Sequence, residues 1–95
     1  MALHLLVAQR DVDGVKWLIG RGVDLNTKRV LWDCNQTALH VTAEGGAIEL
    51  TRILLDAGAD PNIRDDKYHS TVLGWAEFCG QPEIAALLRQ RGATG

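Results

Sequence analysis

The sequence predicts an all-α solenoid in which three helix-turn-helix repeats stack side by side, joined by short β-hairpin-like finger loops. Three observations predict this fold. The chain matches itself at offsets of 36 and 34 residues, each copy carries apolar residues at helical spacing, and glycines follow the helices at matching places. A length of 95 residues with 46% apolar content suits a single small domain, residues 1–95, with one modest core.

The repeats are the strongest pattern in the chain. An offset of 36 places residues 22–26 (GVDLN) on 58–62 (GADPN), and 2–4 (ALH) on 38–40 (ALH). An offset of 34 places residues 37–39 (TAL) on 71–73 (TVL), and Gly46 on Gly80. These matches predict repeats of approximately 1–26, 27–62 and 63–95.

Each repeat is predicted to contain two short helices. In the middle copy, residues 48–57 place Leu50, Ile53 and Leu54 on one face. Gly46 supplies a left-handed turn between the helices, and Gly58 ends the second one. The corresponding helix pairs are expected near residues 2–20, 38–57 and 72–91.

The ends of two further helices carry recognisable signals. Asp11 is expected to cap the second helix of the first copy, and Pro82 to open that of the third. Helices this short are marginal alone, so stacking of about three repeats must stabilise them.

Two motifs resemble the ankyrin repeat family across nearly the whole chain. Residues 37–43 (TALHVTA) resemble the signature T-P-L-H-x-A-A, and residues 58–62 (GADPN) resemble G-A-D-x-N. The resemblance implies a concave groove formed by the fingers and the first helices. It also implies that His40 has a structural role, with hydrogen bonds that tie the first helix to the loops.

The chain departs from this family pattern in its outer copies. In the third copy, Gly74 stands at the histidine position and Glu77 at the second small position. Arg10 occupies the turn position that Gly46 and Gly80 hold, so the first turn is expected to be less regular. Ten residues separate Asn26 from Thr37, which predicts a longer first finger.

Composition excludes several classes of function. A net charge of -2 disfavours nucleic acid and anionic membranes as partners, and no apolar run reaches the roughly 20 residues of a membrane helix. Two cysteines 45 residues apart, with no C-x-x-C pair, indicate reduced thiols and a cytoplasmic location.

Neither catalysis nor metal binding is expected. Phosphate-binding glycine motifs are absent, and no nucleophile, cofactor site or metal site stands out. Four possible zinc ligands lack recognised spacing: Cys34, His40, His69 and Cys79.

The leading hypothesis is therefore that the chain binds another protein through the concave surface. Trp32 and Tyr68 lie in the fingers, and Phe78 occupies a first-helix position that faces the groove in ankyrin repeats. Lys67 and Arg29 stand at the finger edges, where they are candidate partner contacts. Packing of the fingers on one another is the alternative role for the finger aromatics. Trp17 and Trp75, in contrast, are predicted to face the core.

The first helix raises a second hypothesis. It carries the apolar residues Leu3, Leu5 and Leu6, whereas a terminal repeat needs a polar outer face. These leucines are expected to contact an upstream domain or a second copy in a homodimer, unless the helix turns them inward. The chain would then be a structural or regulatory terminal repeat block of a larger multidomain protein.

Overall fold

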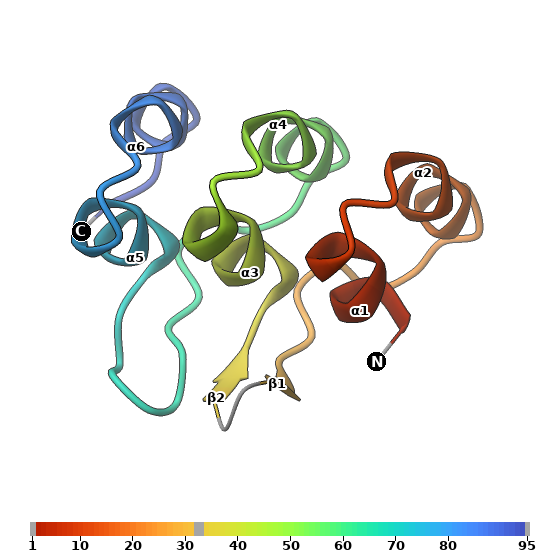
Figure 1. Cartoon of the computed structure of the whole chain (residues 1–95), viewed down its shortest axis with the longest axis horizontal. Helices are drawn as coiled ribbons and strands as arrows, with labels where there is room; N and C mark the ends of the chain where they lie inside the picture. The colour runs from red at the N-terminus through yellow and green to blue at the C-terminus, as the bar shows by residue number, and fades with distance from the viewer. Residues whose placement is uncertain (1, 32–33, 95) are drawn as a thin grey trace.

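The structure, a computed structural model, describes residues 2–31 and 34–94, and it contains three helix pairs in a row (Figure 1). The six helices are α1 (Ala2–Ala8), α2 (Val12–Gly20), α3 (Ala38–Gly45), α4 (Ile48–Asp56), α5 (Val72–Phe78) and α6 (Pro82–Gln90). All three predicted helix pairs are thus present, and the predicted ankyrin-type solenoid is confirmed. The repeat boundaries themselves stay a prediction.

The helices form two layers. In Figure 1, α1, α3 and α5 lie in one layer, α2, α4 and α6 lie in the other, and the fingers extend beyond the first layer. Helix α3 packs between α1 and α5, and α4 packs on α6. The largest fully buried side chains include Leu39, Leu50 and Leu54 of the middle copy, so the core runs along the stack.

The first finger is a two-stranded antiparallel hairpin. Strand β1 (Arg29–Leu31) pairs with β2 (Cys34–Gln36), with Arg29 opposite Gln36. The second finger, residues 63–70, is an irregular loop that lies against the hairpin. The Asp66 amide donates a hydrogen bond to the Asn35 carbonyl at 3.0 Å, and the Asp66 carboxylate forms an ion pair with the Lys28 ammonium.

The turns between paired helices share one backbone conformation in all three copies. Gly46 and Gly80 have positive φ, 73° and 70°, and Arg10 adopts the same left-handed conformation at φ 58°. A side chain in this region costs roughly 1–2 kcal/mol relative to glycine. The Arg10 guanidinium donates a hydrogen bond to the Gly45 carbonyl of the next copy. Arg10, the non-glycine residue at this turn position, therefore links two repeats.

The helix starts also follow the sequence signals. The Asp11 carboxylate accepts from the Gly14 amide, and Pro82 occupies the first turn of α6. Thr37 and His40 form a capping box at α3, in which each side chain bonds the backbone of the other residue. At Gly74, a β-carbon would collide with the hydroxyl of Ser70, so the Ser70 side chain occupies the space beside this glycine.

Two buried histidines tie each of the first two copies to the finger that follows. The His4 Nε2 atom lies 2.7 Å from the Gln36 carbonyl, and the His40 Nε2 atom lies 3.0 Å from the Ser70 carbonyl. The His40 Nδ1 atom accepts from the Thr37 amide at 3.2 Å, which requires the neutral ring. Burial lowers the pKa of both rings, against the opposing effect of the carbonyl contacts. The structural role that the ankyrin resemblance implied for His40 matches these contacts.

Two predictions for the first copy were wrong. Trp17 does not face the core: it is 62% exposed, and the Arg21 guanidinium lies 5.1 Å from its ring centroid. The equivalent residue of the third copy, Leu87, is 8% exposed because α6 packs on α4 of the preceding pair, whereas the described chain has no pair preceding α1 and α2. Leu3 is buried at 4% exposure and is therefore unable to act as an external contact, although Leu5 remains 43% exposed and Leu6 is half-buried.

Candidate partner-binding groove

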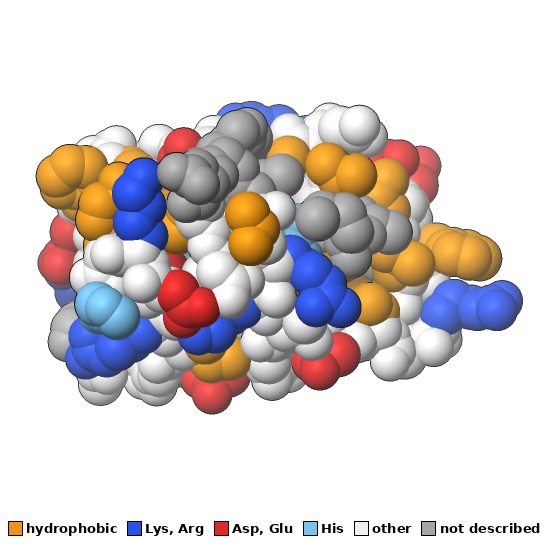
Figure 2. Space-filling model, turned by 90° about the horizontal axis from the view of Figure 1, so that it is seen from below, with side chains coloured by type: hydrophobic (Ala, Val, Ile, Leu, Met, Phe, Trp, Pro, Cys, Tyr) orange, Lys and Arg blue, Asp and Glu red, His pale blue; other side chains and the backbone are white. Residues whose placement is uncertain are grey.

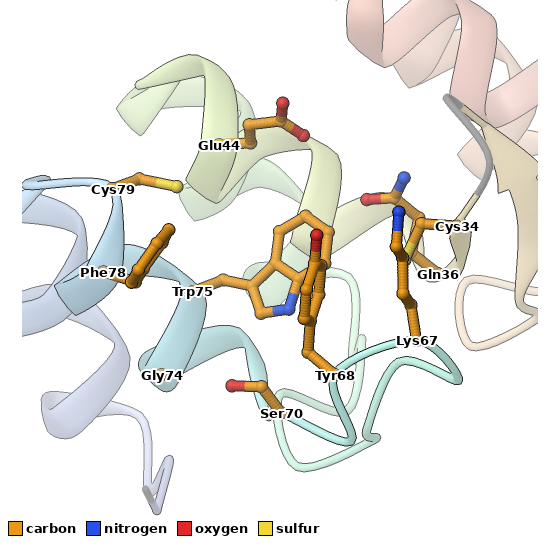
Figure 3. A pocket seen from close by; sticks show the side chains of 10 residues that line it. All are labelled: Cys34, Gln36, Glu44, Lys67, Tyr68, Ser70, Gly74, Trp75, Phe78 and Cys79. Carbon is orange, nitrogen blue, oxygen red and sulfur yellow. The ribbon is translucent and has the colours of Figure 1, made fainter.

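A cleft of about 530 Å³ lies between the second finger and the first helices of the middle and third copies. Figure 3 shows its side chains, which come from β2, α3, the second finger and α5. The lining residues are Cys34, Gln36, Glu44, Lys67, Tyr68, Ser70, Gly74, Trp75, Phe78 and Cys79. The second finger lines one side of the cleft and the packed helices line the other. The helices therefore support the site, and the finger determines its shape.

A buried carboxylate sets the shape of the second finger. Asp65 is 1% exposed, and its oxygens accept from the amides of Tyr68 at 2.6 Å and Ser70 at 2.9 Å. The Trp75 indole Nε1–H donates to the same carboxylate at 2.9 Å, which joins the finger to α5. Asp65 therefore fixes the finger backbone and the Trp75 ring relative to each other.

The ionisation of Asp65 follows from these contacts. Burial alone would raise its pKa, but the donors from Tyr68, Ser70, Trp75 and Cys34 hold the pKa at about 2. The carboxylate is thus charged at neutral pH, when its hydrogen bonds are strongest.

Aromatic rings form the exposed part of the cleft. Trp75 packs edge-on against His40 of the preceding copy at 5.0 Å between centroids, and Tyr68 meets Trp75 at 6.2 Å and 70°. Phe78, in the last turn of α5, is 93% exposed, and Tyr68 is 66% exposed. Exposed aromatic side chains beside a cleft are typical of protein-binding surfaces.

The family assignment rests on sequence similarity along almost the whole chain. A family model described as ankyrin repeats (3 copies) matches residues 3–94. The chain belongs to the ankyrin repeat family.

The relatives that share these ankyrin repeats are diverse proteins. The chain is 32% identical over 91 residues to serine/threonine-protein kinase 12 of Arabidopsis thaliana, covering 96% of this chain and 19% of the kinase. It is 33% identical over 82 residues to the potassium channel GORK of the same plant, covering 86% of this chain and 10% of the channel. A third relative is the ankyrin repeat and KH domain-containing protein mask-1 of Caenorhabditis elegans, at 35% over 79 residues, covering 83% of this chain and 3% of that protein.

The similarity covers a repeat segment of each relative and not the remainder of that protein. The chain spans about a fifth or less of the length of these relatives. Ankyrin repeats are generally protein-protein interaction modules and typically non-catalytic.

The structure brings three of the predicted contact residues of this ankyrin domain together. Tyr68, Phe78 and Lys67 line one cleft. Arg29 is exposed at the start of β1 but is not among the lining residues, and Trp32 lies outside the described residues. Whether a partner contacts any of these side chains stays a prediction.

Sequence reasoning missed the residues that organise the ankyrin groove. Asp65 received no role, and Trp75 was placed in the core although it is half-buried and lines the cleft. A signal for Asp65 was present, because an aspartate at the start of a tight loop commonly accepts from amides two or three residues later. The Trp75 contact carried no such signal, since it joins residues ten positions apart across two elements.

The two cysteines of the groove are poorly suited to catalysis or metal binding. Burial raises the pKa of Cys34, and contact with Asp65 raises it further. Burial and the charge of Glu44 likewise raise the pKa of Cys79, so both groups are thiols at neutral pH. Within residues 2–31 and 34–94, no three His, Cys, Asp or Glu side chains are placed to hold a metal ion.

The remaining surface is mixed in charge. Figure 2 views the finger side and shows acidic and basic side chains interspersed, with apolar side chains gathered at the upper left, at the end where α5 and α6 lie, and at the right, at the end where α1 and α2 lie. Exposed Leu5 and Trp17 belong to the α1–α2 end. Among the described helices, none is long and apolar enough to cross a membrane.

Proposed function

We propose that this ankyrin domain binds a partner protein through the groove, without catalysis of its own. The observation that carries the proposal is the exposure of Phe78 and Tyr68, at 93% and 66%, beside a cleft of about 530 Å³. Large side chains held in water gain roughly 1.5–3 kcal/mol each when a partner buries them. Trp32, Lys67 and Arg29 are proposed as further contacts at the finger edges.

A double variant tests this function. Tyr68→Ala with Phe78→Ala should lose partners that the wild-type chain captures, because it removes both exposed anchors without touching buried residues. Trp17→Ala is the matched control, since Trp17 is about as exposed as Tyr68 but lies on α2. Circular dichroism should show the same helical signal in all three proteins.

A chemical footprint makes the test specific to the groove. Cys79 is partly accessible at the cleft, whereas Cys34 is buried. A groove-bound partner should slow alkylation of Cys79 by a maleimide, in wild type and in Trp17→Ala. Capture that survives the double variant, with Cys79 alkylated at the free rate, would place the binding surface elsewhere.

A second candidate is a terminal repeat block within a larger assembly, in which the α1–α2 end packs on an upstream domain or a second copy. The exposure of Leu5 and Trp17 favours it, since the equivalent residues Val41 and Leu87 are buried by packed helix pairs. Sedimentation tests the second-copy form. Wild type should associate with rising concentration, and Leu5→Glu should stay monomeric. A wild-type monomer at every concentration would leave an upstream domain as the remaining form of this candidate.

We also propose a cytoplasmic location. The two free cysteines support it, because an oxidising compartment favours paired thiols. Fractionation of source cells with an antibody against the chain is the direct test, and recovery outside the cytoplasmic fraction would overturn the proposal.

A further inference from the structure

Three aromatic side chains, Trp75, Tyr68 and Phe78, line the cleft. In Figure 3 the indole of Trp75 lies against the ring of Tyr68, and Phe78 lies to the left of both. The Trp75 Nε1–H is bonded to the charged Asp65 carboxylate, so the ring is fixed and polarised by a neighbouring anion. Aromatic faces carry partial negative charge and attract cations.

An acidic side chain lines the same cleft. Glu44, exposed in the last turn of α3, also lines the cleft, and in Figure 3 it lies above the three aromatic side chains. The ion pairs of the described residues are Lys28–Asp66, Arg89–Glu77 and Arg91–Asp56, so Glu44 belongs to none of them. The Arg10 guanidinium donates to the Gly45 carbonyl and not to the Glu44 carboxylate.

The chain itself already places one cation on an aromatic ring here. The Lys67 ammonium lies 5.5 Å from the centroid of the Tyr68 ring. In Figure 3, Lys67 and Phe78 lie on opposite sides of Tyr68. The space on the Phe78 side of Tyr68 is thus separate from the position that Lys67 takes on the other side.

We propose that this space binds a basic side chain, an arginine guanidinium or a lysine ammonium, presented by a segment of the partner protein. Trp75, Tyr68 and Phe78 contact the cation, and Glu44 pairs with it. The inference rests on the proposed function, since it names the chemistry that the groove recognises.

Charge complementarity decides between a basic occupant and the alternatives. An acidic side chain would face the Glu44 carboxylate and the negative faces of the rings. A purely apolar side chain would cover Glu44 without giving its charge a partner, and burying an unpaired charge is unfavourable. A basic side chain satisfies the carboxylate and the rings together.

A peptide selection tests the proposal with the whole chain. A library of random, blocked hexapeptides on beads is screened with wild type, with Glu44→Gln and with Glu49→Gln. Glu49 is an exposed glutamate in the first turn of α4 and does not line the cleft, so it is the matched control. Wild type and Glu49→Gln should enrich arginine or lysine at least threefold over the input, and Glu44→Gln should not.

A charge-only substitution in the peptide provides the second readout. The best wild-type binders are remade with citrulline for arginine, or acetyl-lysine for lysine, which keep the shape and remove the charge. The dissociation constant should rise about tenfold with wild type and less than threefold with Glu44→Gln. Equal affinity of charged and neutral peptides for wild type would overturn the proposal.

The outcomes separate this inference from the proposed function. If the selected peptides need Tyr68 and Phe78 but show no basic preference, the groove binds and the chemistry proposed here is wrong. If no selected peptide is weakened by Tyr68→Ala with Phe78→Ala, the groove function and this inference fail together.

Discussion

At the scale of single residues, two kinds of buried polar group hold the fingers in place. Asp65 accepts hydrogen bonds from within its own finger and from Trp75, whereas His4 and His40 bond to carbonyls of the next finger. Hydrogen-bond donors keep Asp65 charged, whereas burial disfavours the charged form of both histidine rings. The groove geometry therefore depends on the protonation states of three side chains.

Asp65→Asn should lower the free energy of unfolding by roughly 2–4 kcal/mol, since it removes a charged acceptor and turns an amide N–H₂ toward other donors. Urea unfolding followed by circular dichroism measures the change. Asp66→Asn is the control: Asp66 is exposed, and loss of its pair with Lys28 should cost about 0–1 kcal/mol. Similar losses for the two variants would contradict the role given to Asp65.

The stability of the chain should fall as the pH drops below about 6.5, the unfolded pKa of histidine. Burial holds the folded pKa of His4 and His40 below that value, so below pH 6.5 the unfolded chain binds more protons and unfolding is favoured. The contribution of Asp65 has a separate window. Its folded pKa of about 2 lies below the reference value of 3.8, so that contribution is lost as the pH falls from 3.8 to about 2.

Urea midpoints between pH 8 and pH 5 measure the histidine effect. His69→Asn should keep the decline, because His69 is exposed and Asn tolerates its left-handed backbone. A flat profile in the wild type would show that the buried rings are not held neutral by the fold.

At the scale of helices, burial on both sides makes the middle copy the central element. Helix α3 contacts α1 and α5, whereas α5 has a neighbouring first helix on one side in the described chain. Leu54 of α4 and Leu88 of α6 are both fully buried. Their equivalence allows the effect of position in the stack to be measured with one substitution.

Leu54→Ala and Leu88→Ala should each destabilise by roughly 2–5 kcal/mol, because each leaves a cavity in the core. The loss at Leu54 should be the larger, since disruption of the middle copy weakens two interfaces. Urea titration compares the variants with Leu5→Ala, which should change stability by less than about 1 kcal/mol because Leu5 is partly exposed. A larger loss at Leu88 than at Leu54 would contradict the nearest-neighbour account.

At the scale of the whole molecule, the stack has unequal ends. Among the described helix residues, α2 buries Val15 alone, whereas α4 buries Leu50, Thr51, Leu54 and Leu55. Helix α6 likewise buries four residues, which are Ile84, Ala85, Leu87 and Leu88. The first copy is therefore held least firmly by its own core.

Hydrogen exchange should show this gradient. Amides of α2 should exchange at least tenfold faster than those of α4, because local opening of the first copy exposes less apolar surface. Mass spectrometry of peptic fragments from the isolated chain measures both helices in one experiment. Leu88→Ala serves as an internal check, since it should accelerate exchange in α6 and, through the contact of α6 with α4, affect α4 more than α2. Slower exchange in α2 than in α4 would show that the first copy has support other than its core.

The sequence by itself determined the repeat, the helix pairs and the chemistry of their ends. These features depend on residues close together in the chain: the Asp11 cap, Pro82 in the first turn of α6, and the glycines at left-handed turns. A spacing of three or four residues defines a buried helix face wherever that helix lies. Most of the fold was therefore predictable from local pattern and self-similarity.

Only the tertiary structure decided which side chains are covered and which meet in the groove. Trp17 and Leu87 occupy equivalent positions, yet one is exposed and the other buried, because exposure depends on the neighbouring pair and not on the residue. Likewise, Glu44, Tyr68 and Phe78 come from three elements and line one cleft through the stacking of α3 on α5. Contacts between repeats are set by the packing of separate segments, and no periodicity within one segment encodes them.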